Sequence, residues 1–430
     1  MPPNRTANRP GHTAPGSVPP PRHPIRLVRR THGRAPVAVA AVLMCLAALV
    51  GCQLLRALPA AAVSGPRVLA RTLPGTAAPL PWPASGQASV MIDGYGTTSS
   101  PSQRPVPTAS TAKVMTAYVF LRHHPLRSGG QDPTFTVSAA EASRYPARVA
   151  NGESLTPVTA GEHFTERRAL RAMLTVSANN IADEVARWCS GSRAAFVSEM
   201  NRTARGLGMH STTYTDPAGL DPATVSTPAD QVRLFAAALK LPGFAEVAGA
   251  PAYTEPSGAR HANSNPLLGR KGVFAGKTGT TSAAGKNLVL AARRDIAGTS
   301  RLVVVALMAQ PLFSPTALPG AAAALLTAAD RTLTTAVVVR RGDTVAHLDD
   351  GLGHTQPLRA ARDIIVTGRR GATVTITITP GPRLAPGTAV GSPAARAVAA
   401  GSPAGRSPVP LVTTAPLPHP SLLSRLTRTR

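Results

Sequence analysis

A single apolar run near the amino end limits how everything after it can fold. It reads VAVAAVLMCLAALVGC from Val37 to Cys52 and continues to Leu55. Seven arginines and no acidic residue precede it, because Asp93 is the first acid in the chain. Basic residues ahead of an uncharged run indicate insertion into a membrane with the amino end left inside. The rest of the chain is therefore expected to fold on the extracytoplasmic face.

Three interpretations of this run are open. An uncleaved single-pass anchor over 37–57 is favoured because the basic segment before it is long, although the run is slightly short for a spanning helix. The letters LVGC, ending at Cys52, resemble a lipoprotein signal box whose cysteine carries the lipid. The small residues at 60–62 are typical of ordinary signal cleavage. All three interpretations export the remainder, so the predicted location is the cell membrane.

Changes in composition along the chain predict its organisation. Proline and glycine mark the linkers, whereas helical and alternating apolar periods mark the folded parts. The predicted segments are a basic, Pro-rich, disordered cytoplasmic segment 1–36, the anchor 37–57, a Pro/Ala/Gly linker 58–86, a main domain 87–332, a small β-rich domain 333–380 with an outer limit near 416, and a Pro/Gly/Ala-rich basic tail 381–430.

The net charge of +26 raises the question of an anionic partner. Nucleic acid is not predicted, because no nucleic-acid-binding motif and no interleaving of basic and aromatic residues is present. Anionic lipids or other acidic polymers satisfy the same electrostatics. The histidines lack metal-ligand spacing, so no metal site is predicted.

Lysine is rare in this chain, and its placement is informative. The only lysines are Lys113, Lys240, Lys271, Lys277 and Lys286, so arginine is the default cation. Lys113 stands in the apolar stretch TAKVMTAYVFL. An ammonium can lose its proton inside a protein, whereas a guanidinium effectively cannot. A snorkelling surface lysine is the ordinary alternative for any one such position.

Ser110 precedes Lys113 by three residues at the predicted start of a helix over 110–122. This spacing puts both side chains on one helix face, about 5–6 Å apart at Cβ. The helix start adds backbone N–H donors that stabilise an oxyanion. Burial and a second cation, for which Lys277 is the candidate, lower the pKa of a lysine toward the range that suits a general base.

Two further motifs accompany this pair. SANN, Ser177 to Asn180, lies in a break between two predicted helices, and its ordinary explanation is helix capping, with Asn180 as the cap. GKTGTT, Gly276 to Thr281, enters a strand region, and its ordinary explanation is a turn. The order S-x-x-K, S-x-N, K-T-G in one chain is much harder to explain in those ways.

The three motifs resemble those of the penicillin-recognising serine enzymes. The neighbouring blocks TASTAKVMTA, SANNIADEVA, GLGMHSTTYTDPAGL, STPADQVRLF and HANSNPLLG are similar to those of the D-alanyl-D-alanine carboxypeptidase family, the low-molecular-mass penicillin-binding proteins. The resemblance runs from about Gln87 to Arg331. One departure is Phe274-Ala275 before the third motif, where the family usually has an Asp-Gly pair.

The resemblance implies an α+β fold, with an antiparallel sheet flanked by helices and a small C-terminal β unit behind it. It implies Ser110 as the acylated nucleophile and Lys113 as its base. Ser177 and Lys277 are expected to assist proton transfer. No cofactor is expected.

The resemblance also implies how substrate is held. Asn179 is expected to hold the substrate amide and Thr278 the terminal carboxylate, while Gly279 lets a substrate backbone lie along the strand. The oxyanion is expected between the N–H groups of Ser110 and Thr280. The implied reaction removes the last D-Ala from peptidoglycan stem pentapeptides, and β-lactams are expected to act as covalent inhibitors.

Three other functions use part of the same pattern. A β-lactamase of the most similar class needs a Glu in an E-x-x-L-N loop, and none occurs between Asn180 and Gly276. A D,D-endopeptidase acting on cross-links presents the same D-Ala carbonyl to the serine, so the sequence leaves it open. A non-catalytic penicillin- or wall-binding membrane protein is opposed by the intact Ser110, Lys113 and Lys277.

The base role of Lys113 predicts that Lys113→Arg keeps the fold and loses acylation, because a guanidinium cannot shed its proton. Circular dichroism and labelling with a tagged penicillin measure the two properties. A fully active arginine variant would refute this role.

Overall fold

The computed structural model describes residues 34–126, 132–400 and 407–427. The chain divides into a small unit, Met1–Pro59 with Pro420–Arg430, and a large unit, Ala60–His419. The predicted basic segment 1–36 lies outside the described residues except for its last three positions. The two units are separate bodies, so each is described by itself.

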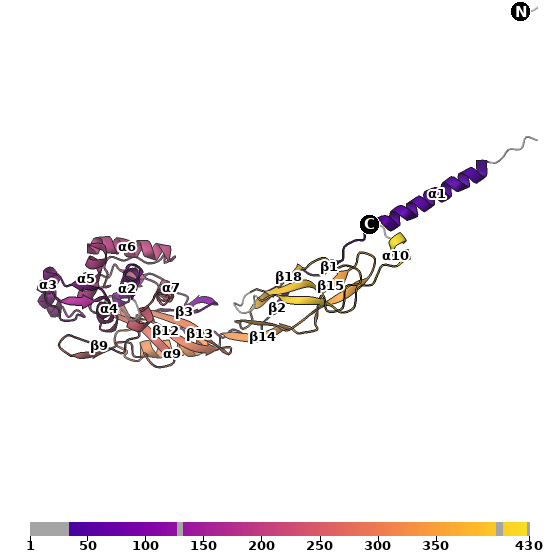
Figure 1. Cartoon of the computed structure of the whole chain (residues 1–430). Coiled ribbons are helices and arrows are strands. Elements are labelled where there is room, and N and C mark those ends of the chain that lie inside the picture. Colours follow the sequence, from indigo (N-terminus) through magenta and orange to yellow (C-terminus); the bar gives the residue numbers. More distant parts are fainter. Residues whose placement is uncertain (1–33, 127–131, 401–406, 428–430) are drawn as a thin grey trace, which may run out of the picture. The chain divides into compact units, whose positions relative to one another are not determined.

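The small unit contains α1 (Arg34–Leu55), the apolar run predicted from the sequence (Figure 1). Its span Pro36–Leu55 has 20 residues and a mean hydropathy of 2.4, and none of it is buried against protein. At 1.5 Å per residue such a helix reaches about 30 Å, the thickness of a bilayer's hydrocarbon core. The helix is therefore long and apolar enough to cross a membrane. The short α10 (Leu422–Thr427) belongs to the same unit.

A five-stranded antiparallel sheet is the centre of the main domain (Figure 1). Its order is β11-β12-β13-β3-β4, so sequence-distant strands meet at β13 and β3. β12 and β13 form an antiparallel hairpin through the turn at Ala297 and Gly298. The strands are β3 (Gln87–Ile92), β4 (Gly96–Ser99), β11 (Val273–Thr281), β12 (Gly285–Ile296) and β13 (Thr299–Gln310).

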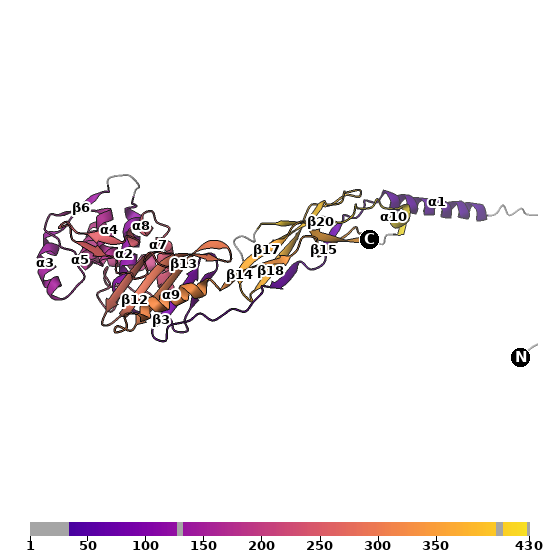
Figure 2. The same cartoon turned by 90° about the horizontal axis from the view of Figure 1, so that it is seen from below.

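Both faces of this sheet are buried, which explains the unbroken apolar runs in its strands. In β13, Val303, Val305 and Leu307 face one core and Val304 and Ala306 face the other. The first face is covered by α9 (Ala317–Ala329), whose buried residues recur at helical spacing (Figure 2). The second face packs mainly against α7 (Pro228–Ala238) and α8 (Phe244–Ala248).

Local capping residues define the ends of several helices on the second side of the sheet. Thr165 and Ser192 cap α4 and α6 with side-chain oxygens. Gly191 ends α5 in a left-handed conformation that suits glycine. The helices are α2 (Lys113–His123), α3 (Ala139–Ala150), α4 (Glu166–Thr175), α5 (Asn179–Ser190), α6 (Arg193–Gly206), α7 (Pro228–Ala238) and α8 (Phe244–Ala248).

The C-terminal β unit is built mainly on a seven-stranded sheet of order β1-β15-β16-β20-β19-β18-β2. In β18 the alternation TVTITIT buries Val374, Ile376 and Ile378 and exposes the threonines between them. A separate pair, β14 (Leu333–Val339) and β17 (Ile364–Arg369), accompanies it. The other C-terminal strands are β15 (Thr344–Asp349), β16 (Thr355–Ala360), β18 (Thr373–Pro380), β19 (Pro393–Ala399) and β20 (Val409–Thr413).

Two strands of this sheet come from the predicted linker 58–86. β1 (Ala62–Ser64) pairs with β15, and β2 (Val68–Thr72) pairs with β18, so they form its two edges. Part of the segment predicted as linker is therefore folded. At the other end, β19 and β20 lie inside the predicted tail 381–430, and the strands stop at Thr413, close to the outer limit of 416.

The position of β2 predicts that a residue far upstream stabilises the C-terminal sheet. Leu73 is 1% exposed in the core of that sheet. Leu73→Ala should cost about 2–5 kcal/mol by opening a cavity. Hydrogen exchange followed by mass spectrometry should show faster exchange in β18 and no change in β13.

Val68→Ala is the matched control, because Val68 lies on β2, which Leu73 directly follows, and is 55% exposed. Unchanged protection of β18 in Leu73→Ala would show that the upstream segment does not contribute to this sheet.

Candidate active site

Ser110 lies in a tight turn that the chain holds from two sides. The turn is a 3₁₀ helix, η1 (Ala109–Ala112), which leads into α2, so the regular helix begins three residues later than the sequence predicted. Ala109 has φ 44°, an unfavourable value for a residue with a side chain. A Cβ at Gly219 would lie 1.8 Å from Ala109 O, so only glycine permits this approach.

A strand of the central sheet holds the segment before the turn. Asn287 on β12 donates its amide hydrogens to Pro107 O at 3.0 Å and to Thr108 O at 2.8 Å. Its Oδ1 accepts from Ala309 N at 2.8 Å, which fixes the orientation of the amide. The turn with Ser110 is thereby attached to the sheet.

Lys113 is fully buried and points at Ser110. Its Nζ lies 2.8 Å from Ser110 Oγ, 2.7 Å from Asn179 Oδ1 and 2.9 Å from Ala218 O. These three partners are a hydroxyl and two neutral carbonyl oxygens, so no carboxylate is bonded to the amine.

The surroundings of Lys113 disfavour its charged form. Burial, and then the positive charge of Lys277, lower its pKa well below the ordinary value of 10.5, while Asp216 and Asp183 act in the opposite direction. Burial also lowers the pKa of Lys277 to about 7. Both causes expected from the sequence, burial and the charge of Lys277, act to lower this pKa.

The second motif lies where it was predicted, in the break between α4 and α5. Ser177 has φ 66°, another unfavourable value, and its Oγ lies 3.1 Å from Lys277 Nζ. Asn179 begins α5 and contacts Lys113. The prediction that Asn180 caps this helix is wrong, because Ala178 is the cap and Asn180 binds the backbone of Thr156 from the first turn.

The third motif lies on β11, an edge strand of the sheet. A Cβ at Gly279 would lie 2.8 Å from Ser110 N, so glycine lets the strand run past the serine turn. Thr280 follows and is exposed. Register shifts once, between Val273 and Ala275, so a β-bulge lies at Phe274, upstream of Lys277. Pairing with β12 is regular from Ala275 to Thr281.

The structure therefore brings all three motifs together around Ser110 and Lys113. It also adds groups to which sequence reasoning gave no role: Ala218 O, Glu153, Ser264 and Asn287. Ser264 Oγ lies 2.6 Å from Thr278 Oγ1, beside the residue expected to hold a carboxylate. Ala218 and Ser264 occur in two of the blocks quoted for the family resemblance, but spacing alone does not reveal their contacts.

Among the residues that the structure describes, no group of three or more His, Cys, Asp or Glu side chains is arranged to hold a metal ion.

Comparisons with known proteins agree with this geometry. Residues 91–310 match the family model Peptidase_S11, D-alanyl-D-alanine carboxypeptidase. The chain is similar to the D-alanyl-D-alanine carboxypeptidase DacB2 of Mycobacterium tuberculosis, with 37% identity over 205 residues, 46% of this chain and 65% of the relative. It is also similar to a D-alanyl-D-alanine endopeptidase of Pseudomonas aeruginosa, with 33% identity over 195 residues, 43% of this chain and 59% of the relative.

The chain thus spans less than two thirds of the length of these two relatives. A crystal structure of a D-alanyl-D-alanine carboxypeptidase from Mycobacterium tuberculosis H37Rv matches with a TM-score of 0.51 and 30% identity, covering 60% of this chain and 95% of that one. The predicted α+β fold is thereby confirmed. The chain belongs to the D-alanyl-D-alanine carboxypeptidase family, Peptidase S11.

Proposed function

We propose that this protein is a serine D-alanyl-D-alanine carboxypeptidase that removes the terminal D-Ala from peptidoglycan stem pentapeptides. The observation that carries the proposal is the buried Lys113 amine, 2.8 Å from Ser110 Oγ and bonded to no carboxylate. A neutral amine in that position is a competent base for a serine hydroxyl. The same serine reacts with penicillins, whose strained amide stands in for the peptide bond.

The residues around Ser110 supply a donor or an acceptor for each proton that moves during acylation. Lys113 takes the proton of Ser110, and Oγ forms a bond to the carbonyl carbon of the penultimate D-Ala. The N–H groups of Ser110 and Thr280 stabilise the oxyanion. The C–N bond then breaks, and the proton that Lys113 accepted passes by way of Lys277 and Ser177, which are bonded to each other, to the leaving amine of the last D-Ala. Lys113, neutral again, then takes a proton from the water that attacks the acyl carbon and gives it to Ser110 Oγ as the shortened peptide leaves.

Substrate binding is assigned to the exposed edge of β11 and to Asn179. A substrate backbone lies along Gly279 as an added strand, and Asn179 holds its amide. Thr278 binds the terminal carboxylate, and Ser264 Oγ, 2.6 Å from Thr278 Oγ1, supplies a second hydroxyl beside it. Lys277, the residue before Thr278, adds positive charge that attracts this carboxylate.

Cleavage of D,D cross-links is the second candidate activity. It is favoured by the 33% identity to a protein named D-alanyl-D-alanine endopeptidase. Both reactions present a D-Ala carbonyl to the same serine and differ in what lies beyond the scissile bond.

The proposed location is the membrane, with α1 as a single-pass anchor and the main domain on the extracytoplasmic face. The apolar span Pro36–Leu55 and the arginines before it support this orientation. Peptidoglycan, the proposed substrate, lies on that side.

The first test is covalent labelling together with product release. Wild-type protein should bind a tagged penicillin covalently and release free D-Ala from an uncross-linked pentapeptide, and Ser110→Ala should lose both properties. Assaying a cross-linked dimer beside the pentapeptide separates the two activities. Absence of any label on wild-type protein would refute the enzymatic proposal and support a binding role.

The second test is the pH dependence of acylation. Only neutral Lys113 accepts a proton, so the rate should rise as the pH increases through the lowered pKa of Lys113 and then become constant. Stopped-flow acylation by a chromogenic cephalosporin from about pH 5 to about pH 9.5 measures this profile. A rate that still rises about tenfold per pH unit at the upper end would show that Lys113 titrates as an ordinary lysine.

A further inference from the structure

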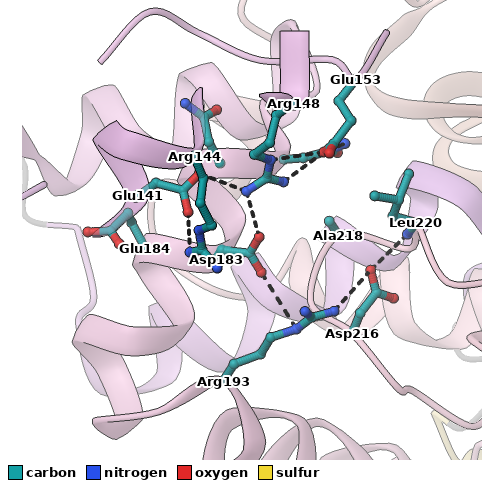
Figure 3. A network of polar contacts seen from close by, with 12 residues as sticks. Glu141, Arg144, Arg148, Glu153, Asp183, Glu184, Arg193, Asp216, Ala218 and Leu220 are labelled. Atoms are coloured by element: carbon teal, nitrogen blue, oxygen red, sulfur yellow. Dashed lines mark hydrogen bonds and ion pairs between the residues drawn. The ribbon is translucent and has the colours of Figure 1, made fainter. Parts of the chain in front are cut away.

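A network of charged side chains, in which Arg148 and the carboxylates are largely buried, leads from α3 to the active site (Figure 3). Its centre is Arg148, whose guanidinium bonds three carboxylates: Glu141 at 2.7 Å, Glu153 at 2.8 Å and Asp183 at 2.9 Å. The side chain of Arg148 is only 12% exposed, so these pairs are screened little by solvent. None of these residues belongs to the three sequence motifs.

Glu153 connects this network to Asn179. Its Oε2 accepts from Arg148 and also from Asn179 Nδ2 at 3.0 Å. The next residue, Ser154, accepts from Asn179 N at 2.8 Å through its backbone oxygen. An ionised carboxylate can only accept hydrogen bonds, so Glu153 binds the NH₂ side of the amide. The oxygen side of Asn179 must therefore face Lys113.

The orientation of this amide decides where the Lys113 lone pair points. A neutral amine has two hydrogens and one lone pair. Asn179 Oδ1 and Ala218 O carry no hydrogen, so they take the two N–H groups. The lone pair is then left for the third neighbour, Ser110 Oγ at 2.8 Å. Proton transfer from serine to lysine requires this arrangement.

The second acceptor of Lys113, Ala218 O, lies in a loop that Asp216 closes. Arg193 lies between Asp183 at 3.7 Å and Asp216 at 4.0 Å. Asp216 accepts from Leu220 N at 2.8 Å and closes the loop that contains Ala218 (Figure 3). Both acceptors of Lys113 are thus linked to carboxylates around Arg148.

We propose that Glu153, held by Arg148, is a positioning residue that orients the Asn179 amide and so directs the lone pair of Lys113 at Ser110. This inference rests on the proposed function of Ser110 and Lys113. Without Glu153 the amide is free to turn over and present Nδ2 to Lys113. The lone pair then accepts from Asn179 instead of from the serine.

The charged groups around Lys113 allow positioning to be separated from electrostatics. Lys277 on β11, Asp216 in the loop after α6, Asp183 on α5 and Arg148 on α3 all act on its charge. Removing the negative charge of Glu153 leaves Arg148 less neutralised, which favours neutral Lys113. An electrostatic effect alone therefore moves the acylation profile to lower pH without lowering its plateau. Loss of positioning lowers the plateau.

The test is the pH profile of acylation in full-length Glu153→Ala and Glu153→Met, compared with Glu153→Gln. The alanine and methionine variants remove the acceptor, and methionine also retains side-chain volume if alanine impairs folding. Their acylation plateau should fall about ten- to a hundred-fold. Glu153→Gln, which still offers an oxygen to Asn179 Nδ2, should keep most of the plateau.

Glu162→Ala is the matched control. Glu162 is another carboxylate; it pairs with Arg168 at 2.8 Å and accepts a hydrogen bond from Thr159 N. Its loss should leave the plateau unchanged, and melting temperatures report the folding of each variant. A plateau within about twofold of wild type in both Glu153→Ala and Glu153→Met, or an equal loss in Glu153→Gln, overturns the inference. Absence of acylation in wild-type protein instead overturns the proposed function.

Discussion

The structure depends on burying the amine of Lys113 against neutral partners. An ammonium buried without a carboxylate is costly, so the protein favours the form that has lost its proton. That preference explains a lysine at this position in a chain whose other cations are almost all arginines, because a guanidinium would stay charged. The free-energy cost of burying this amine is offset by apolar burial elsewhere. The central sheet is buried on both faces, and Val114, Met115 and Ala117 of α2 are fully buried.

Three separate pieces of backbone hold the reacting groups at hydrogen-bond distance. Ser110 stands on a turn next to a strained Ala109, Ser177 is itself in a strained conformation, and Lys277 comes from an edge strand. Such strain persists only where the surroundings over-determine the conformation. Here Asn287 and Gly219 determine the serine turn, and Glu153, paired with Arg148, contacts Asn179, one of the acceptors of Lys113. A rigid scaffold of this kind keeps a base aligned with its nucleophile before substrate arrives.

The motif residues and several helix ends could be predicted because their chemistry is local. Thr165, Ser192 and Gly191 act on their own helices, and Ser110 with Lys113 are one helical turn apart. Residues 62–72 were missed because short edge strands derive their order from partners nearly 300 residues away. β19 and β20 are difficult to predict for a different reason: they are rich in alanine and proline, which carry little strand preference. The contact of Glu153 with Asn179 joins a loop to the first residue of α5, and no periodicity encodes it.

The most direct test of this account is the protonation of Lys113 itself. The chain has only five lysines, so selective ¹³C,¹⁵N-lysine labelling of the full protein in detergent yields few side-chain signals, and Lys113→Met and Lys277→Met assign the two of interest. The account predicts that the Lys113 signal titrates well below 10.5 and that the Lys277 signal titrates at about 7. A Lys113 signal that titrates in the ordinary lysine range would contradict the neutral-amine mechanism.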